Sequence, residues 1–240
     1  MHDNLGQPSP SISTPSKVDA RPHHGTTRRR PLRGGTLSRL VQVASAAALV
    51  ATMLGAGAGS VFAFGNSVPC SGRSEAAVFA PWADTFNYFR VPNGGFESGA
   101  SDWALSGGAT VANGNESSHV GGASESRNLT IPAGGTAESR TICVSRGEDT
   151  IRLFVDSAHV AGSILHVEAI VRSSTGQIAQ TAFDVNGDAS PAGWSPTMRL
   201  GIPNLLGGSG TQNLTLRFTT RGTAATWSID DVYVDPYKSY

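Results

Sequence analysis

The stretch "TWSIDDVYVDPY" (residues 226–237) decides the fold, because it has the apolar alternation of a β-strand with one interruption. Trp227 and Ile229 share one face, whereas the two valines of the following "VYV" have the opposite parity. Successive side chains of a strand point to opposite faces, so an unbroken register cannot bring all of these apolar residues into one core. We therefore expect a β-bulge at Asp230 and Asp231, which would turn the two carboxylates to different sides.

The chain from residue 90 onward repeats this strand pattern. Eight short apolar runs are separated by turn signals such as Gly134-Gly135 and Asn186-Gly187, and no stretch keeps a helical period over three turns. The runs are "RNLTIP" (127–132), "RTICV" (140–144), "TIRLFVDS" (150–157), "SILHVEAIV" (163–171), "QTAFDV" (180–185), "TMRLGIP" (197–203), "QNLTLRFTT" (212–220) and "TWSIDDVYV" (226–234). The pattern predicts an all-β fold, a single jelly-roll β-sandwich over residues 90–240.

Alternation within these runs predicts which residues face the core. The inward residues are Ile151, Leu153 and Val155; Leu165, Val167, Ala169 and Val171; Met198, Leu200 and Ile202; and Leu214, Leu216 and Phe218. The outward positions supply the candidate ligand-binding residues, which are Arg152, Phe154, His166, Glu168, Arg172 and Arg217. If their strands lie side by side, they form a charged surface with one aromatic side chain. A solvated face with cross-strand ion pairs is the alternative.

The two ends of the chain differ in charge. Residues 1–63 hold seven basic and two acidic residues, a net charge of +5, and residues 64–240 hold eleven and sixteen, a net charge of −5. We expect a basic, disordered n-region at residues 1–40 and a signal h-region at residues 41–63, with cleavage near Ala63 and no membrane span after processing. The mature protein would then be secreted, extracellular or associated with the cell wall. An uncleaved anchor is the alternative, and the general and twin-arginine export routes both stay open.

Cys70 and Cys143 are the two cysteines of the chain. In an oxidising compartment such a pair favours a disulfide, with two buried thiols as the alternative. The bond would tie an aromatic leader, residues 64–89, to the β domain and would stabilise the fold by about 4 kcal/mol if it acts through chain entropy. The leader's aromatic residues, Phe79, Trp82, Phe86, Tyr88 and Phe89, either pack against the domain or offer a ligand platform.

Two motifs at the ends of the β domain carry a family resemblance. "VPNGGFESGASDW" (91–103) and "WSIDDVYVD" (227–235) together resemble the terminal strands of carbohydrate-binding modules with the galactose-binding-like jelly-roll fold. The resemblance implies a structural Ca²⁺ ion between these strands, with Glu97 and Asp230 at the positions of the acidic ligands and Asp231 beside them. Calcium takes six to eight oxygen ligands, which carboxylates from two chain ends and turn carbonyls can supply. A plain bulge, whose aspartates accept backbone hydrogen bonds, is the alternative.

The sequence favours binding over catalysis. The one notable catalytic constellation is His166 with Glu168, two residues apart on a single strand, and it is too small to predict an enzyme. The negative charge of residues 64–240 argues against a nucleic-acid partner. We predict a secreted, non-catalytic binding module for an extracellular or cell-wall glycan. The alternative is a structural or interaction protein of the cell surface, which has kept the jelly roll without a sugar site.

Overall fold

The structure, a computed structural model, describes residues 69–205 and 210–235. The predictions made for residues 1–63, which concern the n-region, the signal segment and cleavage near Ala63, lie outside these residues. The elements are η1 (Ala80–Trp82), β1 (Phe89–Arg90), β2 (Trp103–Ser106), β3 (Thr110–Asn113), β4 (Arg127–Ile131), β5 (Thr136–Ser139), β6 (Ile142–Ser145), β7 (Thr150–Asp156), β8 (Ser163–Arg172), β9 (Ile178–Asn186), β10 (Ser195–Pro196), β11 (Leu200–Gly201), β12 (Thr211–Gly222) and β13 (Trp227–Asp235). The described residues contain no helix long and apolar enough to cross a membrane.

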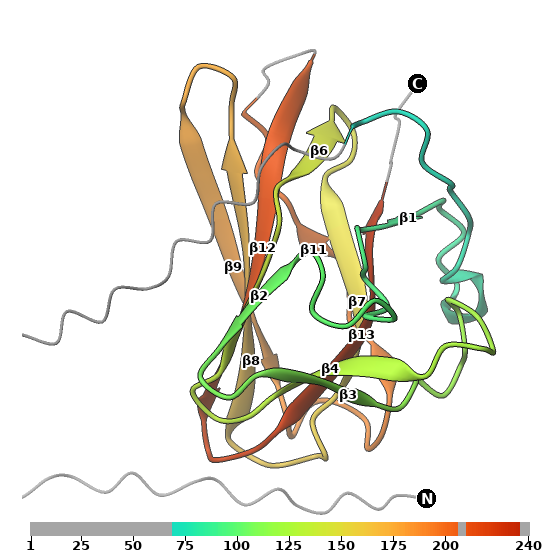
Figure 1. Cartoon of the computed structure of the whole chain (residues 1–240), viewed down its shortest axis with the longest axis vertical. Helices are drawn as coiled ribbons and strands as arrows, with labels where there is room; N and C mark the ends of the chain where they lie inside the picture. The colour runs from blue at the N-terminus through green and yellow to red at the C-terminus, as the bar shows by residue number, and fades with distance from the viewer. Residues whose placement is uncertain (1–68, 206–209, 236–240) are drawn as a thin grey trace, which may run out of the picture. The chain divides into compact units, whose positions relative to one another are not determined.

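These strands form two antiparallel sheets that pack face to face (Figure 1). The seven-stranded sheet has the order β10-β7-β13-β4-β3, with β1 also paired to β13 and β11 to β7. The six-stranded sheet has the order β2-β5-β12-β8-β9, with β6 also paired to β12. The chain crosses repeatedly from one sheet to the other, and the result is the jelly-roll β-sandwich that the sequence predicts.

One hydrophobic core fills the space between the sheets. It includes Leu153 and Val155 of β7 and Leu165 and Val167 of β8, and all four side chains are buried. The predicted inward residues of β7, β8 and β12, together with Leu200 and Ile202, belong to this core. The prediction for Met198 was wrong, because its side chain is 78% exposed. Met198 precedes the short strand β11 and belongs to no strand, so strand alternation does not govern its direction.

The predicted interruption in β13 is a β-bulge. The register of β13 against β7 shifts between Asp230 and Tyr233, and Asp231 has a φ of 49°. A left-handed residue of this kind is uncommon outside glycine, and Asp tolerates it better than most residues. Because the bulge corrects the parity, the apolar residues on both sides of it point into the same core. These residues are Trp227, Ile229, Val232 and Val234.

The leader packs against the outer face of the seven-stranded sheet. The predicted disulfide between Cys70 and Cys143 is present, with its Cα atoms 5.1 Å apart. Phe79 of the leader is fully buried and stacks on Phe154 of β7, with 5.6 Å between the ring centroids. Tyr88 and Tyr233 complete this second hydrophobic cluster. Both faces of the seven-stranded sheet are therefore covered where the leader crosses β7 and β13.

Candidate functional site

A polar cavity opens where the leader meets β7 and the segment before β11. The cavity measures about 290 Å³, and we call it the aromatic pocket. Its lining consists of Trp82, Ala83, Asp84, Thr85, Phe86, Arg152, Met198 and Arg199. Five of these residues are consecutive in the leader, so the packing of Phe79 against the sheet also positions the pocket.

Exposed apolar side chains are concentrated at the aromatic pocket. In the described part of the chain the large exposed hydrophobic side chains are Trp82 (36%), Phe86 (38%), Met198 (78%) and Ile178 (54%). The first three line the pocket, whereas Ile178 begins β9. Large apolar side chains are usually drawn into the core, and a group of them at the surface beside polar residues marks a binding site.

Each of the two exposed aromatic rings contacts a neighbouring side chain. The indole of Trp82 contacts Phe154 edge to face, with 5.3 Å between centroids. Ala83, which follows Trp82, has a φ of 60° and ends the turn η1. The guanidinium of Arg199 lies 5.2 Å from the ring centroid of Phe86, which is within the range of a cation–π contact. Each ring thus contacts a neighbouring side chain, and about a third of each residue stays exposed to solvent.

The buried charged residues of the aromatic pocket, Asp84 and Arg152, belong to one hydrogen-bond network. Arg152 donates from Nη1 to Oδ2 of Asp84 over 2.8 Å and from Nε to the carbonyl oxygen of Thr197 over 2.8 Å. The hydroxyl of Tyr88 donates to the same Oδ2 over 2.7 Å. Burial by itself raises the pKa of Asp84, but the hydrogen bonds from Tyr88 and Arg152 outweigh it and lower that pKa. Asp84 is therefore a paired carboxylate, and Arg199 adds one positive charge to the lining.

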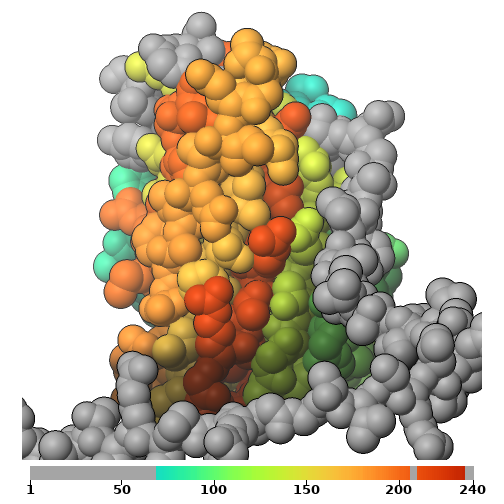
Figure 2. Space-filling model, turned by 90° about the vertical axis from the view of Figure 1, so that its left-hand side faces the viewer, coloured from blue at the N-terminus to red at the C-terminus, as the bar shows by residue number. Residues whose placement is uncertain are grey.

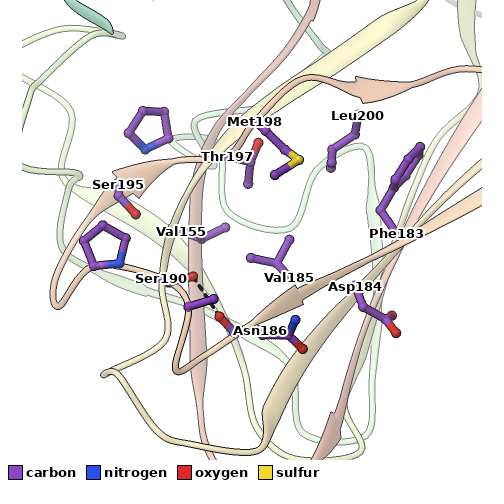
Figure 3. Close-up of a pocket in the computed structure, with 13 residues that line it drawn as sticks. Val155, Phe183, Asp184, Val185, Asn186, Ser190, Ser195, Thr197, Met198 and Leu200 are labelled. Carbon is purple, nitrogen blue, oxygen red and sulfur yellow. Dashed lines mark hydrogen bonds between the residues drawn. The ribbon is translucent and has the colours of Figure 1, made fainter. Parts of the chain in front are cut away.

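Figure 3 shows a second cavity of about 280 Å³. It shares one lining residue, Met198, with the aromatic pocket. The second lining is mainly apolar, with Phe183 and Val185 from β9 facing Leu200 from β11, and Ser190 and Asn186 joined by a hydrogen bond at one end. Trp82 and Phe86 line the first cavity, and Phe183 lines the second.

The structure separates the predicted ligand-binding residues into two places. Arg152 and Phe154 lie on β7 of the seven-stranded sheet, whereas the remaining residues lie on β8 and β12 of the other sheet. Phe154 is fully buried beneath Phe79 and Trp82, so the prediction of an exposed ring was wrong. Arg152 is also buried, and it contributes to the floor of the aromatic pocket.

The outer face of the six-stranded sheet carries a ladder of ion pairs. Figure 2 shows the side of the molecule on which β8 and β9 lie, drawn in yellow to orange. Arg217 pairs with Glu138 over 2.8 Å and with Glu168 over 3.6 Å. His166 Nδ1 lies 2.6 Å from Asp184, and Arg172 is exposed at the end of β8. Cross-strand pairing, the alternative interpretation of these residues, therefore describes His166, Glu168 and Arg217 correctly.

The aspartates of the bulge lie in a second charged cluster, which we call the acidic site. Both Asp230 and Asp231 are buried. Asp230 accepts hydrogen bonds from the backbone N–H groups of Glu116 and Asp231, and Asp231 accepts one from Gly121. The guanidinium Nη1 of Arg90 forms ion pairs with Asp231 Oδ1, over 2.9 Å, and with Glu125. Backbone N–H groups and the Arg90 guanidinium thus stabilise the negative charges of this cluster.

Burial dominates the electrostatics of the acidic site. Burial, together with the nearby charge of Asp231, raises the pKa of Asp230 to about 8, against hydrogen bonds that lower it. Burial also raises the pKa values of Asp231 and Glu125, although the Arg90 guanidinium opposes both shifts. For Arg90 itself, burial lowers the pKa, but the hydrogen bonds with Glu125 and Asp231 outweigh it and the pKa is raised.

Glu97 has partners of its own. Its Oε1 accepts hydrogen bonds of 2.8 Å from the backbone N–H groups of Ser126 and Arg127, at the start of β4. Among the described residues, no group of three or more His, Cys, Asp or Glu side chains is placed to hold a metal ion. The calcium site at Glu97, Asp230 and Asp231 stays a prediction.

Sequence reasoning reached some residues of these two sites and missed others. Trp82 and Phe86 belong to the possible ligand platform of the leader, which is unusually rich in aromatic residues. Met198 and Arg199 lie in a run whose alternation predicts a strand, with Met198 facing the core and Arg199 facing outward. Arg90 is an ordinary residue before "VPNGGFE", and only its contact with Asp231, 141 residues away, shows its role.

No protein-family model matches the sequence, and no curated protein matches it either. Solved structures do match. A family 61 carbohydrate-binding module, solved in complex with β-1,4-galactotriose, is 18% identical, with a TM-score of 0.39, over 60% of this chain and 96% of that chain. The C-terminal family 22 carbohydrate-binding module of Clostridium thermocellum Xyn10B is 13% identical, with a TM-score of 0.36, over 63% of this chain and 96% of that chain.

An α-L-arabinofuranosidase also matches, at 15% identity and a TM-score of 0.41, but the chain covers only 27% of that enzyme. At these identities a match concerns the fold alone and does not extend to a ligand or a reaction. The strand pairing of the chain itself establishes the β-sandwich. Carbohydrate-binding modules and a segment of a glycoside hydrolase are among the proteins to which the chain is similar in fold.

Proposed function

We propose that this chain is a secreted, non-catalytic glycan-binding module whose ligand lies on Trp82, Phe86 and Met198. One observation carries the proposal: three of the large exposed hydrophobic side chains in the described part of the chain surround a single cavity with charged walls. The site belongs to the leader and the 198–199 segment. Of the six candidate ligand-binding residues that strand alternation suggested, only Arg152 lines this cavity.

The chemistry of a sugar fits this lining. A pyranose ring has a flat face of C–H groups, which packs on an aromatic ring, and an equator of hydroxyl groups, which need hydrogen-bond partners. Trp82 and Phe86 offer the first, and Arg199 with the Asp84–Arg152 pair offers the second. The second cavity, which shares Met198 with the first, is the proposed place for a further sugar residue.

Two further features support binding in a secreted protein. Asp84, the one carboxylate among the described residues that line the aromatic pocket, is held by Arg152 and Tyr88, whereas glycoside hydrolysis uses two carboxyl groups across the scissile bond. The proposal therefore includes no catalytic step. The Cys70–Cys143 disulfide is the kind of bond that persists in an oxidising extracellular environment.

Replacement of Trp82 by alanine is the direct test. We expect Trp82→Ala and Phe86→Ala to weaken binding to a polysaccharide at least tenfold, because loss of a stacked ring removes most of the contact area in a site of this kind. Affinity electrophoresis against a panel of neutral and acidic polysaccharides would identify the ligand, and titration calorimetry would measure the loss.

Ile178→Ala is the matched control, since Ile178 is the other large exposed hydrophobic residue in the described part of the chain and lies away from the pocket. Its affinity should equal that of the wild type. A panel without any binding polysaccharide would argue against the proposal, as would a Trp82→Ala variant that binds as well as the wild type.

The outer face of the six-stranded sheet favours a second candidate, a structural or interaction protein of the cell surface. That face carries the ion pairs of Arg217, Glu138 and Glu168 in place of aromatic platforms. Under this reading Arg217→Glu weakens attachment of the protein to cell surfaces, Trp82→Ala does not, and the polysaccharide panel gives no binding.

A further inference from the structure

The nitrogen Nη1 of Arg90 lies at the centre of the acidic site. It contacts carboxylate oxygens from two directions, Asp231 on β13 and Glu125 in the loop between β3 and β4. The side chain of Asp231 is fully buried and that of Glu125 is 9% exposed, so both carboxylates have lost nearly all contact with water. Buried carboxylates need a compensating charge, and Arg90 is the cation that meets both.

Two glycines make the space for this guanidinium. A Cβ atom added to Gly95 would lie 2.7 Å from Arg90 Nη1, 3.0 Å from Glu125 Oε1 and 3.4 Å from Asp231 Oδ1. A Cβ atom added to Gly121 would overlap the same nitrogen and the carboxylates of the same two residues. The backbone of two separate loops therefore closes on the point at which Arg90 meets its partners, and neither loop has room for a side chain there.

Two further acidic side chains of this region accept hydrogen bonds from backbone N–H groups. Glu97 binds the N–H groups that begin β4, and Asp230 binds those of Glu116 and Asp231. Calcium takes six to eight oxygens at about 2.4 Å, and here a charged nitrogen occupies the point between Asp231 and Glu125. The residues that the structure brings together do not fit a metal ion while the guanidinium is in place.

We propose that the guanidinium of Arg90 is the resident cation of the acidic site and replaces the metal ion that the terminal motifs lead one to expect. Arg90 lies on β1, directly opposite Tyr233 of β13, so its charge joins the leader, the β3–β4 loop and the last strand. A guanidinium stays protonated at any pH at which proteins fold. Unlike a metal ion, it cannot be removed by a chelator or lost by dilution.

The test compares thermal unfolding of the full chain in calcium chloride and in EDTA. We expect the wild type to have the same Tm in both solutions. Arg90→Met keeps most of the length of the side chain and removes its charge, and we expect its Tm to fall by roughly 5–10 °C, because it leaves two buried carboxylates without a cation. Arg221→Met is the control at an exposed arginine and should leave the Tm unchanged.

A second variant separates charge from packing. In the background of Arg90→Met, the change Asp231→Asn removes one of the two stranded charges, and asparagine tolerates the left-handed backbone of this position. We expect the double variant to be more stable than Arg90→Met alone. The loss of Tm in the double variant could instead equal the sum of the losses in Arg90→Met and Asp231→Asn. That result would show that Arg90 acts by packing and would overturn the proposal.

Two further results would also overturn it. One is a wild-type Tm that falls in EDTA and recovers when calcium is added, which would mean that a metal ion holds the site. The other is an Arg90→Met variant as stable as Arg221→Met. If Arg90→Met does not fold, the wild-type comparison decides by itself, because the proposal requires that calcium and EDTA leave the Tm of the natural chain the same.

Discussion

Two aspartates show how neighbouring side chains decide whether a buried carboxylate stays charged. Asp84 has a lowered pKa, because hydrogen bonds from Tyr88 and Arg152 outweigh the effect of burial. Asp235 is only 1% exposed and accepts one hydrogen bond, from the hydroxyl of Thr150. Burial, together with the negative charge of Asp84, raises its pKa to about 6, against the hydrogen bond from Thr150.

The raised pKa of Asp235 makes a prediction for stability against pH. The folded protein holds this proton up to about pH 6, whereas the unfolded chain releases it near pH 4. The unfolded state therefore binds fewer protons between these values, and the free energy of unfolding falls as the pH rises through the window, by on the order of 1 kcal/mol. Urea unfolding at pH 4 and at pH 6 would measure the fall.

Asp235→Asn should reduce this fall, because asparagine does not titrate. Asp188→Asn is the control, since Asp188 is exposed, and its pH dependence should match that of the wild type. A wild-type stability that rises between pH 4 and pH 6, and rises equally in Asp235→Asn, would contradict the prediction.

At the level of single residues, sequence reasoning reached the bulge but missed its partner. The change of parity around Asp230 and Asp231 is local and can be read along one strand. The cation at Asp231 comes from Arg90, 141 residues earlier, and nothing in the neighbourhood of either residue indicates the contact. Long-range ion pairs of this kind depend on which strands become neighbours.

At the level of elements, the leader acts as an additional layer of the sandwich. Phe79 is fully buried, and besides stacking on Phe154 it meets the ring of Tyr88 edge to face, with 4.8 Å between centroids. The guanidinium of Arg152 lies 4.3 Å from the centroid of Phe79 on the sheet side. A single side chain thus fills the gap between the leader and β7.

Phe79→Ala should cost about 3–5 kcal/mol of stability, since it removes a buried aromatic ring and leaves a cavity. Urea unfolding of the full chain would measure the loss. Phe86→Ala serves as the control in the same segment, because Phe86 is 38% exposed and its removal should cost less than about 1 kcal/mol. Equal stability of the two variants would show that the leader does not pack as described.

The elements that the sequence predicts best are the long central strands. β7, β8, β12 and β13 show clear apolar alternation, and all four were predicted. The sequence does not reveal β3 and β5, whose "TVAN" and "TAES" hold few apolar residues. Each of these strands is only four residues long, which is too short for a clear alternation to appear.

At the level of the whole molecule, alternation shows which side of a strand faces inward but not which sheet the strand joins. β7 and β8 are consecutive and equally apolar, yet they lie in different sheets. The outward residues Phe154 and His166 therefore belong to opposite sides of the sandwich. The prediction of one charged surface was wrong for this reason. Alternation also could not predict the aromatic pocket, because the pocket forms only where the leader packs against β7.

The disulfide predicts a property of the whole molecule. Cys70 and Cys143 close a loop with a sequence separation of 73 residues, so their bond restricts the unfolded chain and should contribute up to about 4 kcal/mol to stability. Thermal unfolding should shift to lower temperature in the presence of a reductant. A variant with both cysteines replaced by serine should unfold at that lower temperature with or without the reductant, and an unchanged Tm in the reduced wild type would refute the expectation.

The position of β13 has a consequence for how the protein is made. This strand, residues 227–235, lies between β7 and β4 in the middle of its sheet, although it follows every other described strand in the sequence. Until residues 227–235 are made, the edges of β7 and β4 that it joins have no partner. Pairings of this long range form slowly. The seven-stranded sheet therefore closes late in folding, when β13 joins its two halves.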